Sequence, residues 1–273
     1  MTDGLAWLII IITNVLVSYR GFRDQSFFNN WTFEVDKVLK QGEWHRILTS
    51  GFLHVSGTHL AFNMITLYFF AGNIENYLGA WPFLAIYFGS LIGGNLFSLF
   101  IHRHNDLYRA VGASGAVSGV VFAAIALFPG MKLAFIFVPI PFPAWIYGLG
   151  FILYSIYGIR TQRDNIGHEA HLGGAIIGLL IAIAFVPAML QFNQLAISLI
   201  LIPTLIFVIV VIYRPDFLMI DRKYSTYRGH EDEFLERRAQ KRAELNRILE
   251  KINQQGIDSL SQQERDFLDR ERE

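Results

Sequence analysis

The sequence contains no cysteine, which excludes a disulfide framework and a thiolate metal site. Charge is also scarce, because Asp, Glu, Lys and Arg make up 17% of the 273 residues, against about 25% in typical soluble domains. Apart from Arg214, five long stretches hold no acidic or basic residue, namely 47–74, 76–102, 110–131, 133–159 and 170–215. This pattern excludes an ordinary soluble enzyme and indicates segments that lie in a membrane.

Hydrophobic residues make up 53% of the chain. A helix needs about 20 residues to cross the hydrocarbon core. Seven apolar runs approach that length and predict an all-α membrane protein: 5–19, 57–77, 81–101, 114–128, 139–159, 168–188 and 195–213. No basic region precedes the first run, so we expect a retained span rather than a cleaved leader. Between the first two runs, residues 20–46 carry basic and aromatic side chains and are predicted to form an interfacial loop.

The composition changes after Arg214, and residues 216–273 are rich in charge of both signs. Residues 233–252 place apolar side chains on one helical face, which predicts an amphipathic helix that ends near Gly256. Ser261 and Glu264 have the spacing of a capping box and predict a second helix through about Arg270. The tail is therefore expected to be a small soluble helical hairpin.

Ser114 follows a polar loop and begins an apolar run, which places it at a helix N-terminus. Unpaired N–H groups and the positive end of the helix dipole suit a developing oxyanion there. The alternative is that Ser114 is only a helix cap, since serine is a common cap. The run from Ser114 to Pro129 is roughly 24 Å long as a helix, too short to cross the bilayer. Ser114 is therefore expected to lie recessed below one membrane surface.

A serine nucleophile requires a base, and His171 is the best candidate. Gly174 and Gly178 follow it at helical spacing and form a smooth face that can pack against Gly115 and Gly119 of the Ser114 helix. Such packing brings His171 toward Ser114. Two nearby carboxylates do not suit as orienting acids, because Asp164 is in the preceding loop and Glu169 is on another helical face. The sequence thus predicts a dyad.

His59 and Asn63 are four residues apart and share one helical face. Both side chains can donate to an oxyanion beside the Ser114 N–H, although interhelical hydrogen bonding is an equal alternative. His168 and His171 are spaced i and i+3, whereas a zinc-protease helix requires i and i+4, so we expect no metal.

These residues together resemble the rhomboid family over residues 5–190. The family's loop motif ending in Trp/Phe-Arg resembles Glu43–Arg46 (EWHR), and its second-helix pattern resembles His54, His59 and Asn63. Its GxSG motif resembles Gly112–Gly115, and its AHxxGxxxG motif resembles Ala170–Gly178.

The resemblance implies an intramembrane serine endopeptidase that cleaves single-span membrane proteins in or near their transmembrane segments. Ser114 would be the nucleophile and His171 the general base. Oxyanion and substrate binding would fall to His59, Asn63, Gly112, Ala113 and the Ser114 main chain. Glu75 would make a structural hydrogen bond, and structural motifs would include Arg46, Gly115, Gly174 and Gly178. One departure is Ser118, because many relatives have an aromatic there that stacks on the catalytic histidine.

The implied fold is a six-helix rhomboid-type bundle at 1–190, followed by a seventh transmembrane helix at 191–215 and the tail at 216–273. The partners would be transmembrane protein substrates and the lipid bilayer, with no nucleic acid and no cofactor. We expect a multi-pass protein of a bacterial cytoplasmic membrane. Its fifth helix would admit substrate laterally.

The sequence gives two opposite predictions for how the protein is oriented in the membrane. Basic residues gather in the loops on the Ser114 side, while Lys132 is nearly alone on the other, so the positive-inside rule predicts an active site open to the cytoplasm. The family resemblance implies the reverse, which we adopt.

Two other functions compete with a protease: a noncatalytic relative that binds transmembrane clients, and a channel or transporter with His59, His168 and His171 as a proton path. Labelling by a serine-directed fluorophosphonate discriminates between them.

Overall fold

The computed structural model describes residues 4–135, 138–162, 164, 166–214, 218, 244–245, 247–254, 256 and 259–270. The chain divides into two compact units, Met1–Ser225 and Thr226–Glu273. The predicted helix at 233–252 lies partly outside the described residues.

The first unit is built from long helices, and each predicted apolar run overlaps one of them. They are α1 (Ala6–Arg23), α5 (Gly57–Leu78), α6 (Ala80–His102), α7 (Ser114–Leu127), α8 (Ala144–Thr161), α9 (His168–Phe185) and α11 (Gln194–Tyr213). Among the described residues, four helices are long and apolar enough to cross a membrane, namely α1, α6, α9 and α11. The chain is a mostly helical membrane protein.

The helix predicted from the fifth apolar run begins later than expected. The structure has a two-stranded antiparallel sheet of β3 (Lys132–Phe135) and β4 (Val138–Pro143), and α8 starts only at Ala144. The prediction of a helix from residue 139 was wrong because Pro139, Pro141 and Pro143 fall in the run. Proline lacks the N–H that a helix interior requires, and it disfavours helical backbone in the residue before it.

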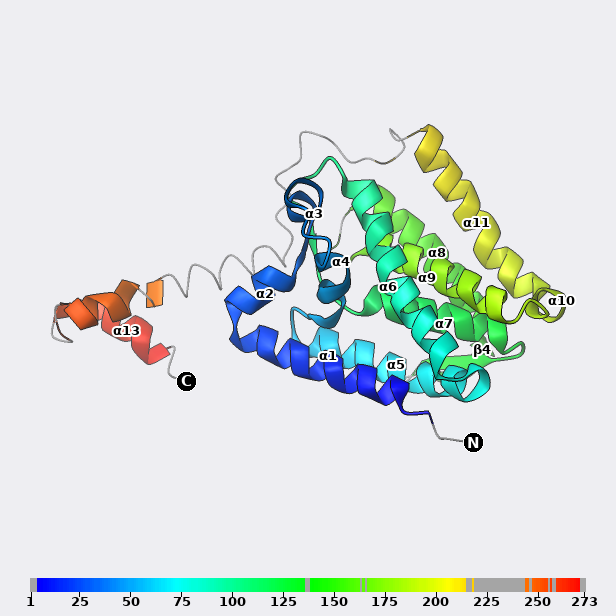
Figure 1. The fold of residues 1–273 in the computed structure, drawn as a ribbon, viewed down its shortest axis with the longest axis horizontal. Helices are drawn as coiled ribbons and strands as arrows, with labels where there is room; N and C mark the ends of the chain where they lie inside the picture. The colour runs from blue at the N-terminus through cyan, green and yellow to red at the C-terminus, as the bar shows by residue number, and fades with distance from the viewer. Residues whose placement is uncertain are drawn as a thin grey trace. The chain divides into compact units, whose positions relative to one another are not determined.

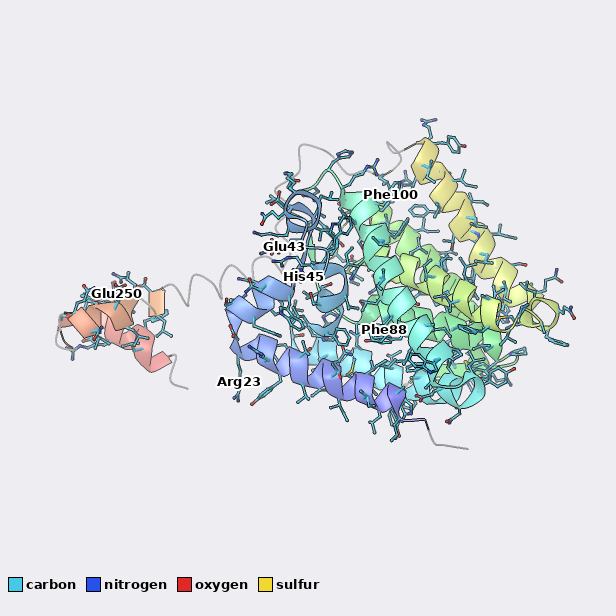
Figure 2. The ribbon with its side chains drawn as sticks, viewed as in Figure 1. Arg23, Glu43, His45, Phe88, Phe100 and Glu250 are labelled. Carbon is cyan, nitrogen blue, oxygen red and sulfur yellow. The ribbon has the colours of Figure 1, made fainter. Side chains whose placement is uncertain are left out.

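Residues 20–46, predicted to form an interfacial loop, contain short helices and a strand. After α1 ends at Arg23, the chain forms α2 (Gln25–Trp31), β1 (Phe33–Glu34) and α3 (Val35–Gln41), followed by α4 (Arg46–Thr49) and the 3₁₀ turn η1 (Ser50–Phe52). Strand β1 pairs with β2 (Arg109–Ala110), which lies just before α7. Figure 2 shows Glu43 and His45 beside α2 and α4. This region thus contacts the segment that leads to Ser114.

Helices α6, α7 and α9 form the centre of the unit, with α1 and α11 on opposite flanks (Figure 1). Helix α7 is buried at every position from Gly115 to Leu127. Two of its last carbonyl groups are also satisfied, because the Asn193 amide, after α10 (Met189–Phe192), donates to Ile125 O at 2.7 Å and Ala126 O at 3.1 Å. A short helix can end inside the protein because such partners replace water.

The second unit has the predicted capping box. The Ser261 N–H donates to Glu264 Oε2 at 2.8 Å, the Glu264 N–H donates to Ser261 Oγ at 3.3 Å, and α13 runs from Gln262 to Arg270. Gly256 has φ of 82° and its N–H donates to Ile252 O, which ends the preceding helical residues 247–254. Glu264 also pairs with Lys251 at 2.8 Å, so the two helical segments contact each other.

Candidate active site

Ser114 is the first residue of α7, and Ala113 occupies the N-cap position. Ser114 thus lies in the first turn of the helix, and no hydrogen bond from a backbone N–H of the described residues to its hydroxyl marks it as a cap. Its side chain is partly exposed, and its hydroxyl makes no hydrogen bond to another described residue. The N–H groups of this first turn lack intrahelical partners. Ser114 thus combines an unengaged hydroxyl with unpaired backbone donors.

Gly112 brings Ser114 and His59 together. Its φ is 131°, in the region that strains any residue with a side chain. A Cβ at Gly112 would lie 2.9 Å from Cε1 and 3.0 Å from Nε2 of His59, and 3.7 Å from Ser114 Oγ. The bare face of this glycine therefore adjoins both the imidazole and the hydroxyl.

His54 holds the turn before Ser114. The Ser18 hydroxyl donates to Phe52 O at 2.8 Å, so it accepts from His54 Nδ1, also at 2.8 Å. His54 Nε2 is then an acceptor for the Ala113 N–H at 3.4 Å. Burial, with a smaller contribution from His59, lowers the pKa of His54 to about 3. The ring is neutral, as its acceptor role requires.

The Gly112 N–H is also used within the protein, since it donates to Ser50 O at 3.0 Å. Two amides expected at the oxyanion site, those of Gly112 and Ala113, are therefore engaged in holding the turn. Of these three amides, the Ser114 N–H is the one with no hydrogen-bond partner among the described residues.

Helices α7 and α9 meet through their backbones, as the glycine spacing predicts. A Cβ on Gly174 would collide with the carbonyl oxygen of Gly115, and one on Gly178 would collide with that of Gly119. A Cβ on Gly115 would lie 3.1 Å from Ala170 O, next to His171. The structure thus brings the start of α9 against the start of α7. Among the described residues no hydrogen bond joins Ser114 to His171, and such bonds often tighten only when substrate binds.

The His171 ring packs against Phe151 of α8, with ring centroids 5.9 Å apart. The sequence did not predict which aromatic side chain packs against His171. The rhomboid resemblance implies an aromatic at position 118, and this chain has Ser118 there. No local signal distinguishes Phe151 from the other aromatics of its run.

The two carboxylates near His171 are engaged elsewhere. Asp164 accepts from His168 Nε2 and from the Tyr154 hydroxyl, each at 3.0 Å. Burial acts to raise the pKa of Asp164, but hydrogen bonding and the charge of His168 outweigh it and lower that pKa below its ordinary value. Glu169 pairs with His102, with Nε2 and Oε1 2.9 Å apart. Neither carboxylate orients His171, which agrees with a dyad.

Asn63 is buried, and its amide donates to His59 O at 3.0 Å within α5. This bond lies within one helix, so it does not match the interhelical alternative. An amide nitrogen carries two hydrogens, so one donor remains for a ligand.

Arg46 and Glu75 hold segments next to α1 through hydrogen bonds to backbone groups. Arg46 Nη1 donates to Asn29 O and Thr32 O, both at 2.7 Å, and thereby holds the segment after α1. Glu75 accepts from the N–H groups of Ala6 at 3.1 Å and Trp7 at 2.9 Å, so its carboxylate caps the start of α1.

Comparison with known proteins matches residues 41–188, just over half of the chain, to the rhomboid domain. The chain belongs to the rhomboid family. Residues 220–271 match a family of unknown function, DUF6576.

Similar proteins include both mitochondrial and bacterial rhomboids. RHOMBOID-like protein 12, mitochondrial, of Arabidopsis thaliana is 33% identical over 193 residues, which cover 65% of this chain and 57% of that protein. Rhomboid protein 1, mitochondrial, of Saccharomyces cerevisiae is 34% identical over 157 residues, 55% of this chain and 45% of that protein. Rhomboid protease AarA of Providencia stuartii is 35% identical over 179 residues, 58% of this chain and 63% of that protein. The chain thus spans less than two thirds of each relative.

Proposed function

We propose that this chain is an intramembrane serine endopeptidase that cleaves single-span membrane proteins in or near their transmembrane segments. One observation carries the proposal. The Ser114 hydroxyl and the His59 ring both lie next to Gly112, which has no side chain to separate them. Ser114 also begins a buried helix whose backbone contacts the helix of His171.

In the proposed reaction, Ser114 Oγ attacks the scissile carbonyl carbon while His171 takes the hydroxyl proton. The negative charge that develops on the carbonyl oxygen is stabilised by the Ser114 N–H, the His59 ring and the free amide hydrogen of Asn63. The C–N bond then breaks, and His171 returns the proton to the leaving amine. Water, deprotonated by His171, attacks the acyl-enzyme and releases Ser114.

The proposed architecture is a six-helix core of α1 and α5 to α9, with α11 as a seventh transmembrane helix and residues 216–273 as a soluble tail. The working environment would be the cytoplasmic membrane of a bacterium, as the similarity to a bacterial relative supports. The partners would be transmembrane protein substrates and the surrounding lipid.

The test combines covalent labelling with cleavage. A fluorophosphonate is expected to label the wild type and a single-span reporter is expected to be cut. Ser114→Ala abolishes both, and His171→Ala greatly reduces both. Ser118→Ala is the matched control, because Ser118 lies one turn further along the same helix and should retain activity. Cleavage that persists in Ser114→Ala overturns the proposal, and absence of labelling in the wild type favours a channel or a noncatalytic binding protein.

A further inference from the structure

A buried polar pair joins the ends of two central helices beside the site. His102 ends α6 and Glu169 lies in the first turn of α9, with Nε2 and Oε1 2.9 Å apart. Their side chains are only 3% and 5% exposed. The dipole of α9 favours this arrangement, since a carboxylate is stabilised at a helix N-terminus.

Stability alone does not explain the pair. A buried polar pair can often be replaced by apolar residues of similar shape with little loss of stability, because desolvation offsets the attraction. His102 Nδ1 is moreover buried without a partner among the described residues, which is a further unfavourable contribution. What the pair does impose is geometry, because it fixes the end of α6 against the start of α9.

Tyr108 connects this pair to the segment that carries Ser114. Its ring stacks on His102, with centroids 3.7 Å apart and planes inclined by 9°. Tyr108 belongs to residues 103–113, which run from α6 to α7, and its hydroxyl lies 4.0 Å from where a Cβ of Gly167 would be. One ring thus touches the pair and the entrance to α9.

We infer that His102 and Glu169, with Tyr108, are positioning residues that fix residues 103–113 against the start of α9 and thereby set the distance from Ser114 to His171. This inference rests on the proposed function. Ser50 and His54 hold the turn from the α5 side, and the glycine contacts hold the helices below it. The His102–Glu169 pair holds the same segment from the α9 side, two residues from His171.

The test uses the full chain in detergent and compares Glu169→Ala with Glu169→Gln, which keeps an oxygen acceptor for His102. Glu169→Ala is expected to lower kcat and the rate of fluorophosphonate labelling by about tenfold to a hundredfold, with KM within about twofold, because small misplacement of reacting groups has effects of that size. Glu169→Gln is expected to restore most of the rate. Tyr87→Phe is the control, since it removes another buried bond, to Asn14 at 3.0 Å, and should change only the Tm.

Two results overturn the inference: an unchanged kcat in Glu169→Ala, or a loss that Glu169→Gln fails to restore in folded protein. If Glu169→Ala does not fold, Tyr108→Leu takes its place, because it removes the stacked ring and leaves the polar pair intact. A wild-type kcat in Tyr108→Leu overturns the inference equally.

Hydrogen exchange separates the two proposals. The amides of Tyr108, Gly112 and Ala113 are hydrogen-bonded within the segment or to its supports. Glu169→Ala is expected to accelerate exchange over residues 103–113 relative to Tyr87→Phe, whether or not the protein turns over substrate. Unchanged exchange there refutes the positioning role. A wild type that is not labelled at Ser114 refutes the proposed function instead.

Discussion

Phe151 of α8 lies against the imidazole of His171, with ring centroids 5.9 Å apart and planes inclined by 30°. The resemblance to rhomboids implies an aromatic one turn along α7 from Ser114, where this chain has Ser118. The aromatic contact with His171 therefore comes from a different helix. Since Phe151 also packs on Phe122 of α7, at 5.4 Å, it links α7, α8 and α9.

Phe151→Leu is expected to lower kcat by about two- to tenfold, because an aromatic contact of this kind contributes about 0.5–1.5 kcal/mol. Steady-state cleavage of a reporter measures the effect. Phe88→Leu on α6 (Figure 2) is the control, since Phe88 packs on Phe52 and Tyr87. Equal rates in the two variants would show that Phe151 does not hold His171.

Gly174→Ala is expected to destabilise the fold by about 1–3 kcal/mol and to abolish activity, because the added methyl overpacks a backbone contact with Gly115. Thermal unfolding in detergent measures the change. Gly150→Ala on α8 is the matched control, because a Cβ there has no neighbour within 4 Å, and its Tm should stay constant or rise. A Gly174→Ala variant as stable as Gly150→Ala contradicts the close packing.

Gly112→Ala is expected to displace His59, because the added methyl would lie against the His59 ring. We expect kcat to fall by about a hundredfold, which is the effect of losing one oxyanion donor. Gly79→Ala provides the comparison. Gly79 also has a positive φ, 92°, but open space around it, so this variant suffers the backbone strain alone. Both variants should lose Tm, and only Gly112→Ala should lose cleavage. Equal activities would place His59 outside the reaction.

Glu264 is expected to make the tail sensitive to acid. Hydrogen bonds from Lys251 and from Ser261 lower its pKa to about 2 from an ordinary 4.5. A carboxyl with a depressed pKa stabilises the folded state above its unfolded pKa, and that stability is lost as pH falls from about 4.5 to about 2. A ¹³C NMR titration of the full chain, with the signal assigned by Glu264→Gln, should give this pKa. An ordinary value contradicts the ion-pair geometry, and Ser261→Ala should raise the pKa part of the way.

The membrane orientation can be measured because the chain lacks cysteine, so a single introduced thiol gives the only label. Leu107→Cys lies in the exposed segment before α7, and Lys132→Cys lies beyond its other end. In sealed right-side-out vesicles, an impermeant maleimide is expected to label Leu107→Cys, and to label Lys132→Cys only after permeabilisation. The reverse result supports the positive-inside prediction.

Features that depend on spacing within one helix could be predicted from the sequence. His59 and Asn63 share a face because they are four residues apart, and the α7 and α9 glycines meet because each pair has the same spacing. That Glu169 lies on another face from His171 also followed from its position, and its side chain pairs with His102 of another helix.

Features that depend on contacts between distant segments could not be predicted. Phe151 is one of several aromatics in its run, and no spacing rule singles it out as the partner of His171. The pairing of His102 with Glu169 spans 67 residues. The start of α8 was misplaced for a different reason, because prolines interrupt the helix without interrupting the apolar run.

Where Gly174 and Gly178 of α9 meet Gly115 and Gly119 of α7, no side chains lie between the two helix backbones. Changes of side-chain rotamer therefore cannot alter the distance between α7 and α9 at this contact. That distance is set by the dimensions of the main chain. Residues on the lipid-facing surfaces of other helices can then diverge, or meet bilayers of different thickness, without altering how the starts of α7 and α9 meet.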